Sequence, residues 1–262
     1  MIQYSKETDE RVDAGPLECW CLHGSVGMAS DWRAFTKQLS THGIGSRAVD
    51  LWRFLETFPL PLPAFSKALN AEAEAEVFRG SGRALIGYSM GGRMALHALL
   101  EENHPWQAAV IISADPGMRN ETERATRRAS DTDWATLALV GDWQKFIESW
   151  EEARSLSGSS PIRDADAPNR LMLRRREVAR SFVDWSVGNQ ESLWHRLCDI
   201  TVPVLWVAGE NDPQYVEIAK RAVAMMPNAT LEIIPNAGHR VPWEAGDWLA
   251  GRTARFLKMG SL

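Results

Sequence analysis

The chain has 262 residues, of which 45% are hydrophobic, with a formal net charge of −5 at pH 7 and a pI of about 5.7. This length favours one α/β domain with an insertion, and the acidic balance argues against binding to nucleic acid or to an anionic membrane through bulk charge. No apolar run is long enough to span a bilayer and the N-terminus lacks a signal-peptide pattern, so we expect a cytoplasmic protein.

The first part of the chain alternates between strand and helix patterns. Strands are expected at residues 17–22, 47–52, 83–86 and 108–114, and helices at 31–39, 65–78 and 92–100. Pro59, Pro61 and Pro63 indicate an irregular loop before the helix at 65–78. We expect this helix to lie on the surface. Cys19 and Cys21 are interpreted as small apolar strand residues, in preference to a metal or redox pair. This alternation predicts a mostly parallel sheet with helices on both faces.

After residue 116 the strand pattern stops, and residues 117–199 show only helices and loops. Asn120 is expected to cap the first of these helices, with Glu123 completing a capping box. Further on we expect a polar loop at 157–168, a helix at 171–187, strands at 203–209 and 230–234, and a helix at 242–258. The sequence therefore predicts a core in two parts, residues 1–116 and 200–262, with a helical lid inserted between two core strands.

The most specific motif is Gly87-Tyr88-Ser89-Met90-Gly91, which stands between an expected strand and an expected helix. A serine on a sharp turn between a strand and a helix is typical of a nucleophile elbow. Side chains at Gly87 and Gly91 would clash in such a turn, so both positions require glycine. The turn would place the Ser89 hydroxyl at a helix N-terminus, where the helix dipole favours developing negative charge.

A serine hydroxyl needs a histidine to take its proton and an acid to orient that histidine. Asp212 and His239 each follow an expected strand, so both are predicted to lie with Ser89 at the carboxyl edge of the sheet. We therefore predict Ser89, Asp212 and His239 as the catalytic residues. Asp115, which also follows a strand, and Glu210 remain alternatives for the acid.

An oxyanion hole needs two backbone N–H donors, one of which comes from the residue after the nucleophile. That residue is Met90. The second donor is expected from the loop at residues 23–27, with Ser25 as the first candidate and Val26 as the next. Glycines in this loop would let its backbone approach a ligand closely.

Four loops carry motifs of one known family: His-Gly at 23–24, Gly-Tyr-Ser-Met-Gly-Gly at 87–92, Gly-Glu-Asn-Asp at 209–212 and Ala-Gly-His at 237–239. Over nearly its whole length the chain resembles the α/β-hydrolase fold. Within that superfamily it most resembles the synthases of menaquinone biosynthesis that form 2-succinyl-6-hydroxy-2,4-cyclohexadiene-1-carboxylate (SHCHC), on Arg93 after the elbow and Asp115-Pro116-Gly117-Met118 after the next strand. The resemblance implies pyruvate elimination from a polycarboxylated substrate, with Ser89 and His239 acting in base catalysis without a lasting acyl-enzyme.

Arginine usage also favours a carboxylated small molecule as the substrate. Arginines outnumber lysines by 23 to 6, and a guanidinium binds a carboxylate through two parallel hydrogen bonds. Arg93 lies one helical turn after Ser89, and Arg127 shares a helix face with neighbouring arginines. These two residues, with Arg174 and Trp150, are the predicted substrate-binding residues. Most other arginines are expected to pair with surface acids.

Two rival functions remain open from the sequence. A carboxylic-ester hydrolase would use Ser89 to form an acyl-enzyme, and a catalytically silent binding protein would use only the pocket under the lid. The sequence carries no metal-ligand cluster, phosphate loop or dinucleotide fingerprint, so we expect neither a metal nor a cofactor.

Overall fold

The computed structural model describes residues 17–76, 80, 82–155 and 166–259. Six strands form one parallel sheet in the order β2-β1-β3-β4-β5-β6. The strands are β1 (Glu18–Leu22), β2 (Gly45–Val49), β3 (Arg83–Tyr88), β4 (Trp106–Ile112), β5 (Val204–Gly209) and β6 (Ala229–Ile234). The predicted parallel α/β fold is confirmed, and its topology places the carboxyl ends of all six strands at one edge of the sheet.

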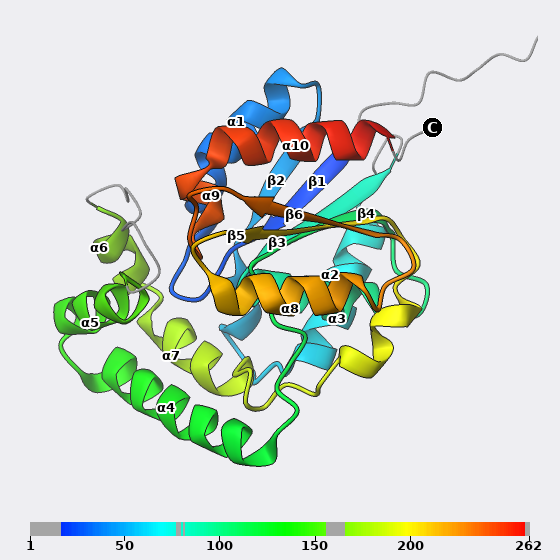
Figure 1. Cartoon of the computed structure of the whole chain (residues 1–262). Coiled ribbons are helices and arrows are strands. Elements are labelled where there is room, and N and C mark those ends of the chain that lie inside the picture. Colours follow the sequence, from blue (N-terminus) through cyan, green and yellow to red (C-terminus); the bar gives the residue numbers. More distant parts are fainter. Residues whose placement is uncertain (1–16, 77–79, 81, 156–165, 260–262) are drawn as a thin grey trace, which may run out of the picture.

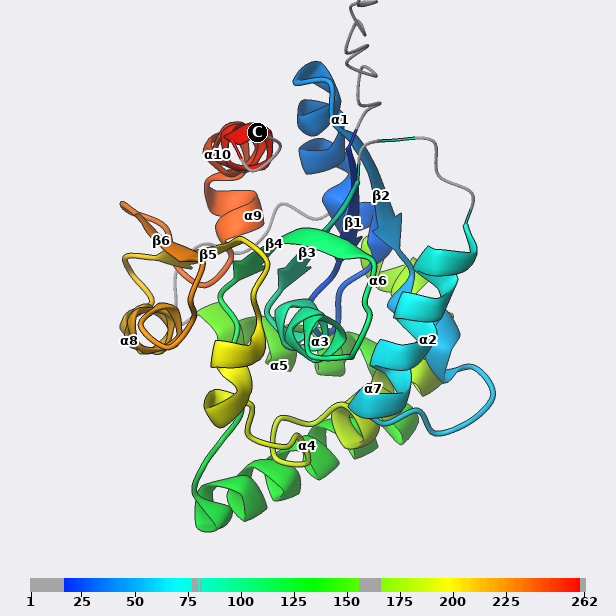
Figure 2. The same cartoon turned by 90° about the vertical axis from the view of Figure 1, so that its right-hand side faces the viewer.

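Helices cover both faces of this sheet (Figures 1 and 2). They are α1 (Arg33–Thr41), α2 (Leu62–Ala75), α3 (Met90–Leu99), α8 (Pro213–Val223), α9 (Val241–Glu244) and α10 (Gly246–Met259). Helices α1 and α10 lie on one face, and α2, α3 and α8 lie on the other (Figure 2). Successive side chains of β1 alternate between the two faces. Cys19 and Cys21 pack on the face covered by α1 and α10, and Trp20 and Leu22 pack on the face covered by α2 and α3.

The two cysteines of β1 are packing residues, as the sequence interpretation holds. Cys19 and Cys21 are completely buried and free of disulfide bonds. Burial raises the pKa of the Cys19 thiol to about 12 and also raises the pKa of Cys21. Because the thiolate is the form that reacts or binds metal, both side chains behave as small apolar groups at neutral pH.

Four helices are inserted between β4 and β5: α4 (Glu121–Val140), α5 (Trp143–Ser155), α6 (Ala167–Met172) and α7 (Arg175–Asp184). We call them the lid helices, and Figure 1 shows them together at one side of the sheet. Asn120 Oδ1 caps α4 by accepting from the backbone N–H groups of the second and third helical residues. An aromatic cluster joins the lid helices, in which the ring of Trp150 lies 5.2 Å from the rings of both Trp134 and Phe182.

The second strand is shorter than the sequence predicts. The prediction extends it to residue 52, whereas β2 ends at Val49 and residues Leu51–Leu55 form a 3-10 helix, η2. The cause is a local hydrogen bond, because the Asp50 carboxylate accepts from the backbone N–H of Trp52 at 3.1 Å and caps η2. The short helix turns the chain across the sheet edge near the loop at residues 23–27, where Trp52 Nε1 donates to the Gly27 carbonyl at 2.9 Å.

Helix α2 begins earlier than predicted and is partly buried. It starts at Leu62, because Pro63 lies in its first turn, where a proline costs no hydrogen bond. The expected irregular loop therefore ends before Pro63. Phe65 and Leu69 are completely buried, so α2 is a core helix with one exposed face. The end of the predicted helix, at residues 77 and 78, lies outside the described residues.

Two other predicted helices are each divided in two. The pattern at 171–187 predicts one helix, but a turn at Leu173 and Arg174 separates α6 from α7. The helix predicted at 242–258 is divided at Ala245 into α9 and α10. Helix α8 was not predicted, and most of the polar loop predicted at 157–168 lies outside the described residues. None of the described helices combines the length and apolar character needed to cross a membrane.

Candidate active site

Ser89 occupies a strained turn between β3 and α3. Its backbone angles are φ 52° and ψ −111°, a conformation that residues other than glycine rarely adopt. A Cβ atom at Gly87 would overlap the Gly91 carbonyl, and a Cβ atom at Gly91 would overlap the carbonyl of Leu22 on the neighbouring strand. Glycine at both positions therefore lets the helix pack directly on the sheet and holds Ser89 at the sheet edge.

A chain of two hydrogen bonds connects Ser89 to an acid. Ser89 Oγ lies 3.2 Å from His239 Nε2, and His239 Nδ1 lies 2.7 Å from Asp212 Oδ2. A carboxylate only accepts, so Nδ1 donates to Asp212 and the unprotonated Nε2 accepts from the Ser89 hydroxyl. Asp212 and His239 are only 7% and 5% exposed, so the hydrogen bond between them is shielded from water. The arrangement can remove a proton from Ser89 and stabilise the imidazolium that results.

The carboxylate that contacts His239 is that of Asp212, and the two alternative acids bond elsewhere. Asp115 Oδ1 accepts from the backbone N–H of Gly117 at 2.8 Å. Glu210 Oε2 accepts from the backbone N–H of Asn236 at 3.1 Å. Both residues therefore support loops at the sheet edge.

Glu244 fixes the loop that carries His239 by contacting the residues before and after it, a role that sequence reasoning missed. Its carboxylate accepts from the backbone N–H of Gly238 and, at 3.1 Å, from that of Arg240. These two residues flank His239, so one carboxylate on α9 fixes the backbone that carries the imidazole. The Arg240 guanidinium also pairs with Glu151 Oε2 at 2.6 Å, which connects this loop to lid helix α5. The signal in the sequence was an acid five residues after the histidine.

The loop after β1 faces the elbow. Ser25 lines the same cavity as Ser89, and Val26 has a positive φ of 53°, an outlier for a β-branched residue. A Cβ atom at Gly24 would lie 2.8 Å from the Tyr88 ring, so the close approach of loop and elbow requires glycine there. His23 has a structural role, since its ring nitrogens contact the Gly24 carbonyl at 2.9 Å and the backbone N–H of residue 51 at 3.3 Å.

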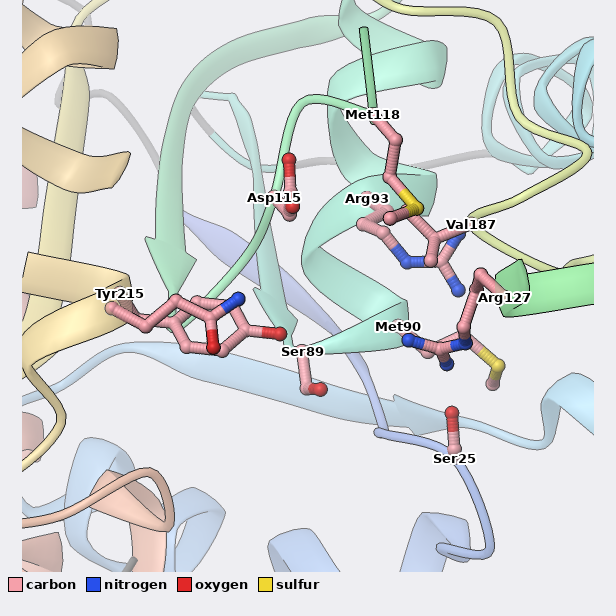
Figure 3. A pocket seen from close by; sticks show the side chains of 10 residues that line it. Ser25, Ser89, Met90, Arg93, Asp115, Met118, Arg127, Val187 and Tyr215 are labelled. Carbon is pink, nitrogen blue, oxygen red and sulfur yellow. The ribbon is translucent and has the colours of Figure 1, made fainter. Parts of the chain in front are cut away.

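A cavity opens beside Ser89 and is lined mainly by polar side chains (Figure 3). Its ten lining residues are Ser25, Ser89, Met90, Arg93, Asp115, Met118, Arg127, Val187, Gln214 and Tyr215. In Figure 3, Arg93 and Arg127 lie to the right of Ser89, Tyr215 lies to its left, and Asp115 lies above it. Sequence reasoning anticipated the two arginines and gave Asp115 as an alternative catalytic acid, but it did not place Gln214 or Tyr215 at the cavity.

Arg93 carries a buried positive charge that forms no ion pair with any residue the structure describes. The residue is 8% exposed, and its guanidinium donates to Gln190 Oε1 at 2.7 Å and to the Trp185 carbonyl at 2.8 Å. Both acceptors are neutral, and no carboxylate of the described residues lies within ion-pair distance of Arg93. Burial, and then the nearby charge of Arg127, lower the pKa of Arg93 to about 10, so it stays protonated at neutral pH.

Arg127 reaches the cavity from lid helix α4. Its Nε donates to Asp131 Oδ1 at 2.9 Å, one turn along the helix. The buried Asp131 also accepts from Ser186 Oγ at 2.6 Å, so Arg127 is oriented by a carboxylate that is itself fixed. The side chain remains 35% exposed. The two guanidinium groups that line the cavity therefore come from different parts of the fold, α3 of the core and α4 of the lid.

The other two predicted substrate-binding residues are not among those that line this cavity. Arg174 pairs with Asp50 at 3.2 Å and with Glu56, both next to η2. The turn that divides α6 from α7 directs Arg174 to these acids. Trp150 is 5% exposed and belongs to the aromatic cluster of the lid helices. Within the described part of the chain, no group of three His, Cys, Asp or Glu residues has the arrangement of a metal site.

Comparisons with known proteins agree with this architecture. Residues 21–252 match the Alpha/beta hydrolase family. A Bacillus subtilis (strain 168) protein named "Putative 2-succinyl-6-hydroxy-2,4-cyclohexadiene-1-carboxylate synthase" is 31% identical over 229 residues, covering 84% of this chain and 83% of its own length. The 2-succinyl-6-hydroxy-2,4-cyclohexadiene-1-carboxylate synthase from Serratia proteamaculans (strain 568) is 28% identical over 228 residues, covering 86% of each chain.

The solved structure of MenH from S. aureus has the same fold, with a TM-score of 0.82 at 22% identity over 96% of this chain and 97% of that chain. An esterase from Exiguobacterium antarcticum also shares the fold, with a TM-score of 0.70 at 15% identity over 94% and 93% of the two chains. The match over most of the chain, together with the parallel sheet and its helical insertion, shows that this chain belongs to the alpha/beta hydrolase family.

Proposed function

We propose that this protein is a lyase of the SHCHC synthase type, which eliminates pyruvate from a carboxylated small molecule. The observation that carries the proposal is the shared cavity of Ser89, Arg93 and Arg127, because it puts two cationic side chains beside a serine that is hydrogen-bonded to His239. Arg93 has no carboxylate partner in the described structure, so a substrate carboxylate would supply one. The similarity to curated SHCHC synthases over most of both chains supports the same reaction class.

In the proposed reaction, His239 acts as the base through Ser89. His239 Nε2 accepts the Ser89 proton while Ser89 Oγ removes a proton from a substrate carbon next to a carbonyl group. The electron pair of the broken C–H bond forms a new C=C bond, and the C–O bond to the enolpyruvyl group breaks, with its electron pair leaving on oxygen. The leaving enolate takes up one proton on carbon and becomes pyruvate, while His239 gives up the proton that it received. Asp212 keeps the imidazole oriented throughout.

The negative charge that develops on the substrate carbonyl oxygen needs donors. We propose the backbone N–H groups of Met90 and Ser25 for this role. Met90 begins α3, so its N–H belongs to a helix N-terminus, and Ser25 lines the same cavity. Removing one such donor typically lowers the rate by about 10²- to 10³-fold.

The proposal includes three coarser expectations from the sequence. We propose a small carboxylated substrate, a cytoplasmic location, and a division into a core of residues 1–116 and 200–262 with a lid of residues 117–199. Arg174 and Trp150 are left out of the proposed substrate contacts, because the first pairs with acids beside η2 and the second packs inside the lid.

One experiment separates this proposal from its main rival. Ser89, His239 and Asp212 in the same arrangement could also form an acyl-enzyme, so a carboxylic-ester hydrolase is the second candidate. Purified protein would be given the pyruvate-bearing precursor of SHCHC and, separately, a panel of short aryl esters. We expect pyruvate and SHCHC in equal amounts, slow or no ester hydrolysis, and an unmodified intact mass. Rapid ester turnover with an acyl group on Ser89, and no pyruvate, would favour the hydrolase.

A further inference from the structure

The cavity beside Ser89 holds a negative charge that the proposed elimination does not use. Asp115 follows β4 and lines the cavity together with Arg93 and Arg127. In Figure 3 the Asp115 side chain lies above Ser89, between Tyr215 on the left and Arg93 on the right. A pocket built only to attract a polycarboxylate would have no reason to present a carboxylate of its own, since like charges repel.

The loop geometry holds this carboxylate in place. Asp115 Oδ1 accepts from the backbone N–H of Gly117 at 2.8 Å. Residues 116 and 117 are bonded in turn to the loop after α7, where the Pro116 carbonyl accepts from the N–H of Leu193 and the Gly117 carbonyl accepts from Trp194 Nε1, both at 2.8 Å. Such a support fixes a charged group before a ligand arrives. In the described part of the chain Asp115 Oδ2 has no hydrogen-bond partner, so it can accept from a ligand.

Arg93 and Asp115 attract each other through space but do not form an ion pair. The Asp115 charge acts to raise the pKa of Arg93, against the larger effect of burial, yet no N–O distance between them is within ion-pair range. A single ligand in the cavity can therefore contact both. A carboxylate suits Arg93 and Arg127, and a hydrogen-bond donor suits Asp115. An ammonium donor would face two guanidinium groups in the same cavity, so a neutral hydroxyl fits better.

We propose that Asp115 is a specificity-determining residue that accepts a hydrogen bond from a substrate hydroxyl, so that this position of the cavity prefers a hydroxyl to a further carboxylate. This inference rests on the proposed function and refines its substrate class. Asp115 then sets the direction in which the substrate lies across Ser89, with its carboxylate toward Arg93 and its hydroxyl toward Asp115. An apolar group at the same place would leave the carboxylate without a partner.

The test measures binding, so it does not depend on catalysis. Dissociation constants are measured by ligand-observed NMR for cyclohexane-1-carboxylate and for its derivatives with a 2-hydroxyl, a 2-amino or a second carboxylate group, as cis and trans isomers. The proteins are the wild type, Asp115→Asn and Asp133→Asn. The Asp115→Asn variant keeps a side-chain oxygen for the N–H of Gly117 but loses the charge, and Asp133 provides the same charge change at an exposed position on α4.

We expect the wild type to bind one hydroxy acid at least about tenfold more tightly than the parent acid, as for a hydrogen bond to a charged group. Asp115→Asn should lose this preference and bind the dicarboxylate more tightly than the wild type does, whereas Asp133→Asn should match the wild type. Any of four results would overturn the inference. Three concern the wild type: equal binding of the hydroxy and parent acids, tighter binding of the 2-amino derivative than of the hydroxy acids, or no binding of any ligand. The fourth is an Asp115→Asn variant that keeps the wild-type preference. Pyruvate release by the wild type is measured separately, so the proposed function can stand when the inference fails, and the reverse.

Discussion

The role proposed for Arg127 can be tested against its own neighbour. Arg127 and Arg128 both lie on α4, both have side chains that are 35% exposed, and each pairs with an acid, at 2.9 Å and 2.7 Å. Only Arg127 lines the cavity beside Ser89. Replacing each by glutamine therefore removes the same charge from the same helix, and only one replacement removes a contact proposed for the substrate.

The magnitude follows from the type of contact. A charge-assisted hydrogen bond contributes about 1.5–3 kcal/mol, so Arg127→Gln should lower kcat/KM by about 10- to 100-fold, mainly through a higher KM. Arg128→Gln should stay within about twofold of the wild type, because its contacts are to the Gly188 carbonyl and to the exposed Glu121. Arg127→Lys keeps the charge without the planar fork, so we expect an intermediate loss.

The assay is pyruvate release, coupled to NADH consumption by lactate dehydrogenase, with thermal unfolding of each variant as the check on folding. The Asp131 carboxylate loses one partner in Arg127→Gln but keeps Ser186, so the variant should remain folded. Equal kcat/KM losses in the two glutamine variants would show that Arg127 acts only through the lid. An unchanged KM in a folded Arg127→Gln protein would refute the contact itself.

Two further predictions concern groups around the site. Glu244→Gln should lower kcat about tenfold with little change in KM, because Glu244 uses one carboxylate oxygen for each N–H group that flanks His239 and glutamine has only one oxygen. Glu217→Gln, at an exposed position on α8, should have no effect, and equal activity of the two variants would contradict the positioning role. Burial, and then the charges of Arg93 and Arg196, lower the pKa of His97 from 6.5 to about 4. As the pH falls from 6.5 to 4, His97 therefore becomes protonated in the unfolded chain but stays neutral in the folded one. The free energy of unfolding should drop by about 3 kcal/mol over this range. Urea unfolding at several pH values should show this extra slope in the wild type and not in His97→Gln; equal slopes would refute it.

The sequence predicts the scaffold of the site well, because that part depends on local rules. Alternating buried strands and helices imply a parallel sheet, and a parallel sheet brings the ends of its strands to one edge. Ser89, Asp212 and His239 each follow a strand, so their meeting required only that the strands be identified. The elbow was equally predictable, because a Cβ atom at position 87 or 91 would overlap backbone atoms, as the structure shows.

The walls of the cavity were harder to predict, because they depend on how helices end and turn. A single turn between α6 and α7 directs Arg174 to Asp50 and Glu56, and no periodicity argument could assign it to that side. Trp150 faces the other aromatic rings of the lid helices, which a high tryptophan content does not distinguish from a pocket wall. Gln214 and Tyr215 line the cavity from α8, a helix that the sequence pattern had not identified.

In the proposed reaction, Ser89, activated by His239, takes a proton from the substrate and releases pyruvate without an acyl-enzyme. The most direct test of this reaction is single-turnover pyruvate release from the SHCHC precursor by the wild type and by Ser89→Ala, with intact mass recorded during the reaction. We expect the alanine variant to be slower by about 10²- to 10⁴-fold, the range for a positioned acid–base group, and the wild-type mass to stay constant. Equal rates in the two proteins, or a mass increase on the wild type that decays with turnover, would contradict it.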